Sequence, residues 1–328
     1  MQVDPVTRPG IVVVGSNMVD LISYLERQPQ QGETVFGRKF FQGFGGKGAN
    51  QACMAALLGG QVEIVTCIGD DLFGPGWSAH FEEFGVGTRH MKTVEGIHSG
   101  VASIWVEADG ANRIVLGAGA NTHLEERHVE RSLDHLFGER AWDVVLCQLE
   151  VSQASIAQAF ATGRKKGAVN ILNPGPAAPL RDDILLSTDW LLPNETELRL
   201  LAGEMYGLVD EDDLRLAQKF AEKSGIGLVV TLGGRGAVLI RRGEACRPLH
   251  LPAPAVDVAD TTGAGDCFAG AFAYGIAAGW DPVKAVKVAI AVSADSVRRS
   301  GTAASYPRGE ALGLLVGGAA REPEGVDT

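Results

Sequence analysis

Short apolar runs alternate with longer segments of helical periodicity along most of the chain. The run 11–14 contains only isoleucine and valine and ends at Gly15, which is typical of a buried strand. Strands that alternate with helices at this spacing predict a mainly parallel sheet with helices on both faces. The expected fold class is α/β, a Rossmann-like three-layer αβα domain. Further strands are predicted at 62–68, 143–149, 168–172, 189–192, 226–232 and 237–241, and helices near 48–58, 75–84, 152–166, 195–202, 212–223 and 263–300.

Two stretches of the chain have strand character without a partnering helix. Residues 34–40 are predicted to form a short, exposed antiparallel strand. Residues 101–107 and 112–116 are strand-like runs joined through Asp109-Gly110, a dipeptide typical of hairpins. We expect both stretches to form one small sheet that covers a cleft; edge strands of the main sheet are the alternative. The predicted organisation is a single domain, 1–328, with a lid sub-domain from about 18–44 and 98–120.

The composition narrows the classes of function. Acidic residues outnumber basic ones by 40 to 29, and the net charge of −11 leaves no basic footprint for nucleic acid. The five cysteines are scattered without CxxC spacing, so neither a disulfide framework nor a zinc site is expected. No apolar stretch approaches the roughly 18 residues of a membrane span, and no signal peptide is recognised. We expect a cytoplasmic protein with small-molecule partners, and neither nucleic acid nor a membrane among them.

The strongest chemical signal is the motif DTTGAGD at 260–266, at the start of an alanine-rich helix. The first amides of a helix have no internal acceptor, and glycines let a phosphate approach them. Gly263, Ala264 and Gly265 are therefore predicted to cradle a phosphoryl group. Asp266 lies in the first turn, where its carboxylate is placed to accept the proton of an attacking hydroxyl. The alternative is an ordinary N-cap with an acidic residue in the first turn.

The second signal is the motif GFGGKGAN at 43–50, which satisfies the spacing GxGxxG. A dinucleotide fingerprint should follow the first buried strand directly, but that strand ends at Gly15. A Walker A loop is excluded because Gly48, rather than Ser or Thr, follows Lys47. The favoured alternative is a polyol site, in which glycine amides and Asn50 offer hydrogen bonds to hydroxyl groups.

Polar residues also lie near the carboxyl ends of predicted strands, where ligands of open α/β sheets bind. Asp20 follows the first strand and Glu150 follows the strand 143–149, so each is either a sugar contact or a solvated loop acid. Asn194 and Glu197 have the spacing of a helix capping box, which is favoured over a site for Mg²⁺ and phosphate. The glycine-rich turn at 231–236 either holds a nucleotide or makes a tight hairpin.

The motif pair GGKGAN at 45–50 and DTTGAGD at 260–266 resembles the two signatures of the ribokinase-like (PfkB) sugar kinases. The resemblance extends from about 11 to 307 and is closest to the ribose-phosphorylating members. It implies ATP-dependent phosphorylation of D-ribose at its 5-hydroxyl by a homodimer whose lid acts as the clasp. Fructokinase-like and adenosine kinase-like activities are alternatives within the family. An NAD-dependent oxidoreductase and a catalytically silent sugar-binding regulator are alternatives of other classes.

The resemblance also implies individual roles. Asp266 would be the base, with Gly263, Ala264 and Gly265 as the anion hole, and Glu197 would arrange Mg²⁺ and water. The residues implied for ribose are Asp20, Gly46, Lys47, Asn50, Glu150 and Asp266, and those implied for ATP are Asn194, Thr231, Gly233, Gly236 and Gly265. The residues implied for a monovalent cation, several through backbone oxygens, are Asp260, Thr262, Ser296, Arg299, Gly301 and Ser305.

The cation is also favoured by the charges around the phosphate cradle. Asp260 lies six residues before Asp266, and its carboxylate would repel a phosphate unless a cation lay between them. It is not expected to be needed for capping, because Thr261 or Thr262 could fill that role. The loop 299–305 has glycine and serine residues that let carbonyls turn inward. We therefore expect activation by K⁺.

The chain departs from the family pattern at two places. Met18 lies two residues before Asp20, where bacterial ribose-phosphorylating members carry asparagine, so one sugar contact is lost or supplied elsewhere. Ile290 occupies a place near the adenine where the family often has a polar side chain. The first departure concerns the identity of the sugar.

Overall fold

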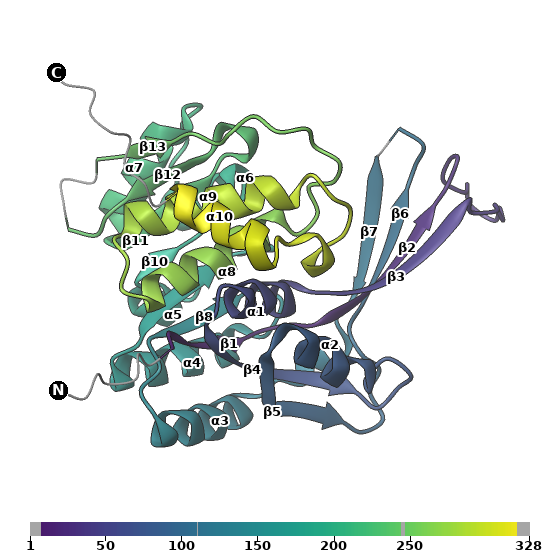
Figure 1. Cartoon of the computed structure of the whole chain (residues 1–328), viewed down its shortest axis with the longest axis horizontal. Helices are drawn as coiled ribbons and strands as arrows, with labels where there is room; N and C mark the ends of the chain where they lie inside the picture. Colours follow the sequence, from purple (N-terminus) through teal and green to yellow (C-terminus); the bar gives the residue numbers. More distant parts are fainter. Residues whose placement is uncertain (1–7, 110, 244–246, 320–328) are drawn as a thin grey trace.

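The computed structural model describes residues 8–109, 111–243 and 247–319, and the strands of this part form two separate sheets (Figure 1). The larger sheet contains β1 (Gly10–Val14), β4 (Gln61–Gly69), β5 (Val86–Val94), β8 (Val144–Gln148), β9 (Val169–Asn173), β10 (Trp190–Leu191), β11 (Gly227–Thr231), β12 (Ala237–Ile240) and β13 (Leu249–Leu251). Their order is β13-β12-β11-β10-β9-β8-β1-β4-β5. All pairs from β11 to β5 are parallel, and β12 and β13 add antiparallel pairs at one edge.

Helices cover both faces of this sheet, as the side chains of β1 require. Ile11 and Val13 belong to one hydrophobic core, while Val12 and Val14 belong to a second core on the opposite face. The first core is covered by α1 (Lys47–Leu57), α2 (Gly76–Phe84), α8 (Ala264–Ala277), α9 (Pro282–Ser296) and α10 (Gly309–Ala319). The second is covered by α3 (Glu126–Glu139), α4 (Gln153–Lys166), α5 (Asp182–Ser187), α6 (Glu195–Tyr206) and α7 (Asp213–Ser224). The predicted three-layer αβα fold is confirmed.

The remaining strands form a four-stranded sheet, here called the small sheet, that projects from the α/β body (Figure 1). It contains β2 (Met18–Tyr24), β3 (Lys39–Gly45), β6 (Val101–Val106) and β7 (Asn112–Gly117), in the order β3-β2-β6-β7. The two outer pairs are antiparallel, whereas β2 and β6 are parallel. This arrangement agrees with the expected small sheet made from two separate stretches of the chain. Because its strands form a sheet of their own, the alternative that they are edge strands of the main sheet is excluded.

Several local predictions need correction. The strand expected at 34–40 instead spans Lys39–Gly45, as β3. Its position is set by antiparallel pairing with β2, in which Gly45 lies opposite Met18 and Lys39 lies opposite Tyr24. The helical stretch 263–300 is two helices, since Gly279 has a φ of +69° and the chain restarts at Pro282. The pattern did not predict β5 or α10. The antiparallel pairing of β6 and β7 confirms the hairpin, although Gly110 of its turn lies outside the described residues.

Three short 3₁₀ segments, η1 (Gly119–His123), η2 (Gly233–Arg235) and η3 (Ala303–Ser305), connect the larger elements. Two of them lie in segments that the sequence marks for nucleotide and cation binding. None of the helices in the described residues is long and apolar enough to cross a membrane.

Candidate active site

The two glycine-rich motifs converge on one buried carboxylate. Helices α1 and α8 pack against each other, and Asp266 lies in the first turn of α8. Nδ2 of Asn50 donates to Oδ2 of Asp266 at 2.9 Å, and Nε2 of Gln51 donates to Oδ1 at 3.0 Å. Asp266 is only 7 % exposed. Its carboxylate orientation is therefore fixed by two amide donors that come from the other motif, 216 and 215 residues earlier in the chain.

The start of α8 has the geometry of an anion cradle. Gly263 is the N-cap with a φ of +76°, in the left-handed region that favours glycine. Its carbonyl accepts the first helical hydrogen bond, from Cys267 N at 2.8 Å, and Ala264 N donates to Thr261 O at 3.2 Å. Gly265 and Asp266 follow as the second and third helical residues, whose amides have no acceptor within the helix. Since no atom lies within 4 Å of a Cβ built on Gly265, the residues fit the approach of a phosphate group.

Asp20, Glu150 and Asp266 form one acidic group, and Lys47 lies beside the last two. Burial, together with the negative charges of Glu150 and Asp266, raises the pKa of Asp20 to about 7. Burial also raises the pKa of Glu150, despite hydrogen bonds to its Oε2 from Ser16 Oγ at 2.5 Å and Lys47 N at 2.9 Å. The charge of Asp266 raises the pKa of Lys47, which is held as a cation among these acids. Such a cluster is suited to a ligand that brings several hydroxyl donors.

Two glycines before α1 let the backbone approach these side chains. A Cβ on Gly45 would lie 2.3 Å from Oδ2 of Asp20, so only glycine leaves room for this carboxylate. Gly46 has a φ of +88° and is the N-cap of α1, which turns the chain from the small sheet into the α/β body. A Cβ on it would lie 2.7 Å from Met18 N. The glycines of this motif therefore serve close backbone packing around Asp20.

Most of the residues expected at ATP follow the neighbouring strands β10 and β11, whereas Gly265 lies in the first turn of α8. Asn194 and Glu197 form the predicted capping box of α6, and an isolated parallel bridge joins Asn194 to Thr231. The turn after Thr231 is both a hairpin between β11 and β12 and a glycine-rich loop. Gly233 and Gly236 have φ values of +54° and +96° in this turn.

Glu197 also lies close to the buried Lys47. A Cβ built on Gly175 would be 2.8 Å from both Glu197 Oε1 and Lys47 Cε. One oxygen of Glu197, Oε2, accepts from Asn194 N at 2.9 Å. Among the described residues, no three His, Cys, Asp or Glu side chains are grouped to hold a metal ion. Mg²⁺ would therefore fit here only with phosphate and water as its main ligands, beside Glu197.

The residues expected at a monovalent cation are brought together by protein hydrogen bonds. Oδ1 of Asp260 accepts from Thr262 N at 2.9 Å, and Oδ2 accepts from Gly301 N at 3.0 Å. Burial alone would raise the pKa of Asp260, but these hydrogen bonds outweigh it and lower the pKa below its usual value. The guanidinium of Arg299 donates to Ser305 O at 2.8 and 3.0 Å. Asp260 does not cap α8, whose N-cap is Gly263 rather than Thr261 or Thr262, but its carboxylate joins the 260–262 turn to the 299–305 loop.

Ser296 lies at the end of α9 near this loop. Its carbonyl accepts from Arg299 N at 3.2 Å, and its hydroxyl donates to Ser293 O at 2.8 Å. Ser296 O accepts this one hydrogen bond and retains a second lone pair for a weakly held monovalent ion, whereas Ser305 O already accepts two bonds from Arg299.

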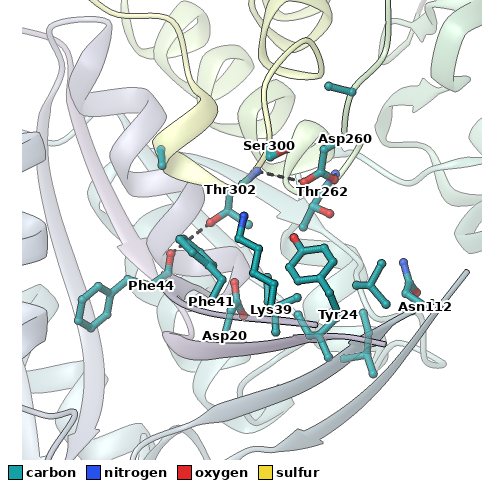
Figure 2. A pocket seen from close by; sticks show the side chains of 18 of the residues that line it. Asp20, Tyr24, Lys39, Phe41, Phe44, Asn112, Asp260, Thr262, Ser300 and Thr302 are labelled. Atoms are coloured by element: carbon teal, nitrogen blue, oxygen red, sulfur yellow. Dashed lines mark hydrogen bonds between the residues drawn. The ribbon is translucent and has the colours of Figure 1, made fainter. Parts of the chain in front are cut away.

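A cavity of about 520 Å³ lies between the small sheet and the C-terminal loops. Figure 2 shows Asp20 and Lys39 of the small sheet on one side, and Thr262 and Thr302 on the other. Asp266 does not line this cavity. Asp20 connects the cavity with Asp266, because it lines the cavity and its pKa is raised in part by the charge of Asp266.

Some residues of the site were not singled out from the sequence. Gln51 directly follows the predicted Asn50, and Ser16 lies just after β1, at the carboxyl end of a strand. Their positions in the sequence could therefore have indicated them. Thr302 and Tyr306 contact the small sheet and the start of α8 through long-range hydrogen bonds. No local pattern marks these two, because their partners are more than 40 residues away.

The fold and the site together define a kinase that acts on a small polyhydroxyl substrate, and comparisons with known proteins agree. Residues 8–308 match the pfkB family of carbohydrate kinases, and the chain belongs to this family. It is thus an ATP-dependent sugar kinase, as the motif pair predicted. It is 38 % identical over 299 residues to the deoxyribokinase of Salmonella typhi, which covers 90 % of this chain and 95 % of the relative. It is 36 % identical over 310 residues to the ribokinase of Mus musculus, covering 93 % and 94 %.

Solved structures are similar over nearly the whole chain. The ribokinase from Thermotoga maritima has a TM-score of 0.84 and 31 % identity, and the match covers 94 % of this chain and 99 % of that structure. The ribokinase of Arabidopsis thaliana complexed with ribose and ATP has a TM-score of 0.82 and 30 % identity, with the same coverage. The family and fold expected from the motif pair are confirmed.

The position of Asp266 generates the first prediction. Asp266→Asn should lower kcat by roughly 10²–10⁴-fold, the usual contribution of a general base, because an amide cannot accept the proton of the attacking hydroxyl. The measurement is steady-state ADP release, with circular dichroism to verify folding. The exposed Asp134→Asn of α3 is the matched control and should leave kcat unchanged. Turnover near the wild-type value in Asp266→Asn would remove this residue from the role of base.

The raised pKa of Asp20 generates the second prediction. With a pKa of about 7, Asp20 is protonated at lower pH and becomes a full carboxylate acceptor as the pH rises through 7. The kcat/KM for the sugar should therefore rise with pH up to about 7 and then level off. Asp20→Asn should have low kcat/KM and lack this acid limb. The assay is a pH profile of sugar kcat/KM at saturating MgATP; an acid limb of unchanged position in Asp20→Asn contradicts the assignment.

Proposed function

We propose that this kinase transfers the γ-phosphoryl group of ATP to the 5-hydroxyl of a pentose, with D-ribose as the first candidate. The observation that carries the proposal is the Asp266 carboxylate, held by Asn50 and Gln51 at the start of α8 and next to the acidic group of Asp20 and Glu150. The relatives named ribokinase and the structure of one with ribose and ATP support the sugar.

The geometry suits an in-line transfer. Asp20, Glu150, the amide of Gly46 and the ammonium of Lys47 would hold the sugar hydroxyls, and Asn50 would add an amide oxygen. The Oδ1 atom of Asn50 is buried and has no hydrogen-bond partner in the part of the chain that the structure describes, so it is available to accept from a hydroxyl. Asp266 would take the proton of the attacking hydroxyl. The amides of Gly263 and Gly265 would stabilise the charge that develops on the phosphoryl oxygens, and the amide of Ala264 would join them by exchanging its bond to Thr261 O.

The nucleotide would lie on the far side of the cradle, along Asn194, Thr231, Gly233 and Gly236. Mg²⁺ would neutralise charge on the phosphates when bound, with Glu197 arranging its water. Lys47 keeps a positive charge among the acids and would limit their repulsion of the incoming phosphate. We also place the enzyme in the cytoplasm, which is consistent with four buried free thiols among the described residues.

A specific observation favours 2-deoxy-D-ribose as a second candidate. Met18 and Asp20 lie on the same face of β2, and Met18 is buried with its sulfur 3.7 Å from Asn121 Nδ2. An apolar side chain here offers no hydrogen bond to a hydroxyl of the sugar. A relative of 38 % identity is named deoxyribokinase. A hydroxyl placed against this apolar side chain loses its hydrogen bond to water without gaining one from the protein. A sugar that lacks this hydroxyl therefore loses less binding free energy here than a sugar that carries it.

We further propose K⁺ as an activator and a homodimer through the small sheet. The oxygens of the 260–262 turn and the 299–305 loop would hold the ion and keep the cradle in shape. The outer strand β7 is exposed along its whole length and carries Ile114, Val115 and Leu116, which are 53 %, 69 % and 49 % exposed. An exposed apolar edge strand of this kind favours pairing with a second copy of the chain.

Substrate choice is tested by a panel of D-ribose, 2-deoxy-D-ribose, D-fructose and adenosine with ATP. We expect the highest kcat/KM with one of the two pentoses. Met18→Asn should raise the ratio of kcat/KM for ribose to that for 2-deoxyribose, by about tenfold if one net hydrogen bond is gained. Met205→Asn on α6 is the matched control and should leave the ratio unchanged. Phosphorylation of fructose or adenosine alone would reject the pentose assignment.

Cation dependence is tested by titrating K⁺ into a buffer of bulky organic cations at constant ionic strength. The initial rate at saturating sugar and MgATP should rise with K⁺ and rise less with Na⁺, because the larger ion loses its water at lower cost. Asp260→Asn should weaken the response. A flat response to K⁺ would reject the activator, and so would equal activation of wild type and Asp260→Asn.

The dimer is tested by light scattering after size-exclusion chromatography. The wild-type protein should elute as a dimer, and Val115→Lys should shift it to the monomer because a charge would be buried against the apolar edge. Val209→Lys, at an 86 % exposed position in the loop before α7, is the control and should remain dimeric. A monomeric wild type, or a dimer that survives Val115→Lys, contradicts the proposal.

A further inference from the structure

The loop from Ser300 to Tyr306 touches both halves of the site. Oγ1 of Thr302 donates to the carbonyl of Phe44, on β3 of the small sheet, at 3.1 Å. The hydroxyl of Tyr306 donates to the carbonyl of Gly263, the N-cap of α8, at 3.0 Å. Figure 2 shows Thr302 at this junction, with its hydrogen bond to the β3 backbone drawn. One short loop therefore joins the sugar side to the phosphate side.

The loop is held as a unit between these two contacts. The carbonyl of Thr302 accepts two hydrogen bonds from Ser305, one from the amide at 2.9 Å and one from the hydroxyl at 2.8 Å. Arg299 clamps the carbonyl of Ser305, and Gly301 N donates to Asp260. A Cβ on Gly263 would lie 3.1 Å from Thr302 Cα, so the loop backbone packs directly on the cradle. A displacement at Phe44 is thus passed on to Gly263, since packed segments shift together.

The Phe44 end of the link moves with the sugar pocket. Gly43 pairs with Asp20 across β2 and β3, and Phe44 is the next residue along the strand. The Phe44 ring contacts Trp77 and His80 of α2, with centroids 4.7 and 5.0 Å apart. Phe44 therefore joins the small sheet to the α/β body directly beside Asp20, the proposed sugar acceptor.

The Tyr306 end of the link fixes the cradle. Tyr306 is 3 % exposed, and burial raises the pKa of its hydroxyl well above the usual value, which keeps it a proton donor. Its partner, the carbonyl of Gly263, also accepts the first helical bond of α8. The hydroxyl therefore constrains the peptide that sets the direction of the first amides of the cradle.

We propose that Thr302 and Tyr306 are positioning residues that couple sugar binding at the small sheet to the shape of the phosphate cradle. The proposal rests on the proposed sugar kinase function but adds two residues that this function does not itself assign to sugar or nucleotide binding. Ligand binding that orders the Phe44 segment would also order Gly263, so the nucleotide binds more tightly to the sugar-loaded enzyme. By linkage, the nucleotide would tighten sugar binding by the same factor.

The coupling factor is measured by calorimetry with D-ribose, or 2-deoxy-D-ribose if the panel favours it, and a non-hydrolysable ATP analogue with Mg²⁺. In the wild type, saturating sugar should tighten the analogue about 5- to 150-fold, the usual range of coupling between sites. Thr302→Val and Tyr306→Phe each remove one hydroxyl and keep the side-chain shape. Both should bring the factor close to one, lower kcat, and leave the affinity for sugar alone within about twofold.

Thr122→Val and Tyr206→Phe are the matched controls, since Thr122 is exposed and Tyr206 packs on Phe220 away from the site. They should keep the wild-type coupling factor. A wild type without coupling overturns the proposal, and so do wild-type coupling factors in both variants. Equal losses of sugar and nucleotide affinity together with a lowered Tm also overturn it, because they indicate a purely structural role. Failure of the proposed function is distinguished by the sugar panel, in which neither pentose would be phosphorylated.

Discussion

The buried carboxylate of Asp266 is held by Asn50 and Gln51, and most of the site depends on this arrangement. A buried charge is costly unless hydrogen bonds and opposite charge compensate for it. The two amide donors come from α1, while the ammonium of Lys47 supplies the charge. The starts of α1 and α8 must therefore lie side by side. Gly46, with its positive φ, makes the sharp turn that brings α1 there from the small sheet.

The protein's own groups do not compensate these acids fully. Asp20, Glu150 and Asp266 form one acidic group, Lys47 lies beside the last two, and burial with the neighbouring charges raises the pKa of Asp20 to about 7. The buried Oδ1 of Asn50 has no hydrogen-bond partner among the described residues. Sugar hydroxyls are donors that could satisfy these acceptors without adding charge. The crowded acids and the unpaired amide oxygen are therefore the groups that would give affinity and orientation to a polyol, and perturbed groups of this kind are common at functional sites.

The sequence predicted the fold class and the convergence of the two motifs better than the local details. The αβα alternation was clear because buried strands such as β1 and amphipathic helices such as α7 have strong periodicity. The position of β3 was wrong because glycines at 43 and 45 suggest a turn, whereas pairing with β2 keeps them in a strand. Thr302 and Tyr306 gave no signal, since their hydrogen bonds join segments that only the fold brings together.

Several residues show why a local role and a functional role cannot be separated by spacing alone. Asn194 and Glu197 form a complete capping box, yet Asn194 also bridges to Thr231 of the glycine-rich turn. Asp260 accepts from the amides of Thr262 and Gly301, which ties the 260–262 turn to the 299–305 loop. In both cases a side chain that completes a turn also fixes the backbone from which a ligand would be held. The hydrogen bonds that stabilise these turns are therefore part of the preorganisation that phosphoryl transfer requires.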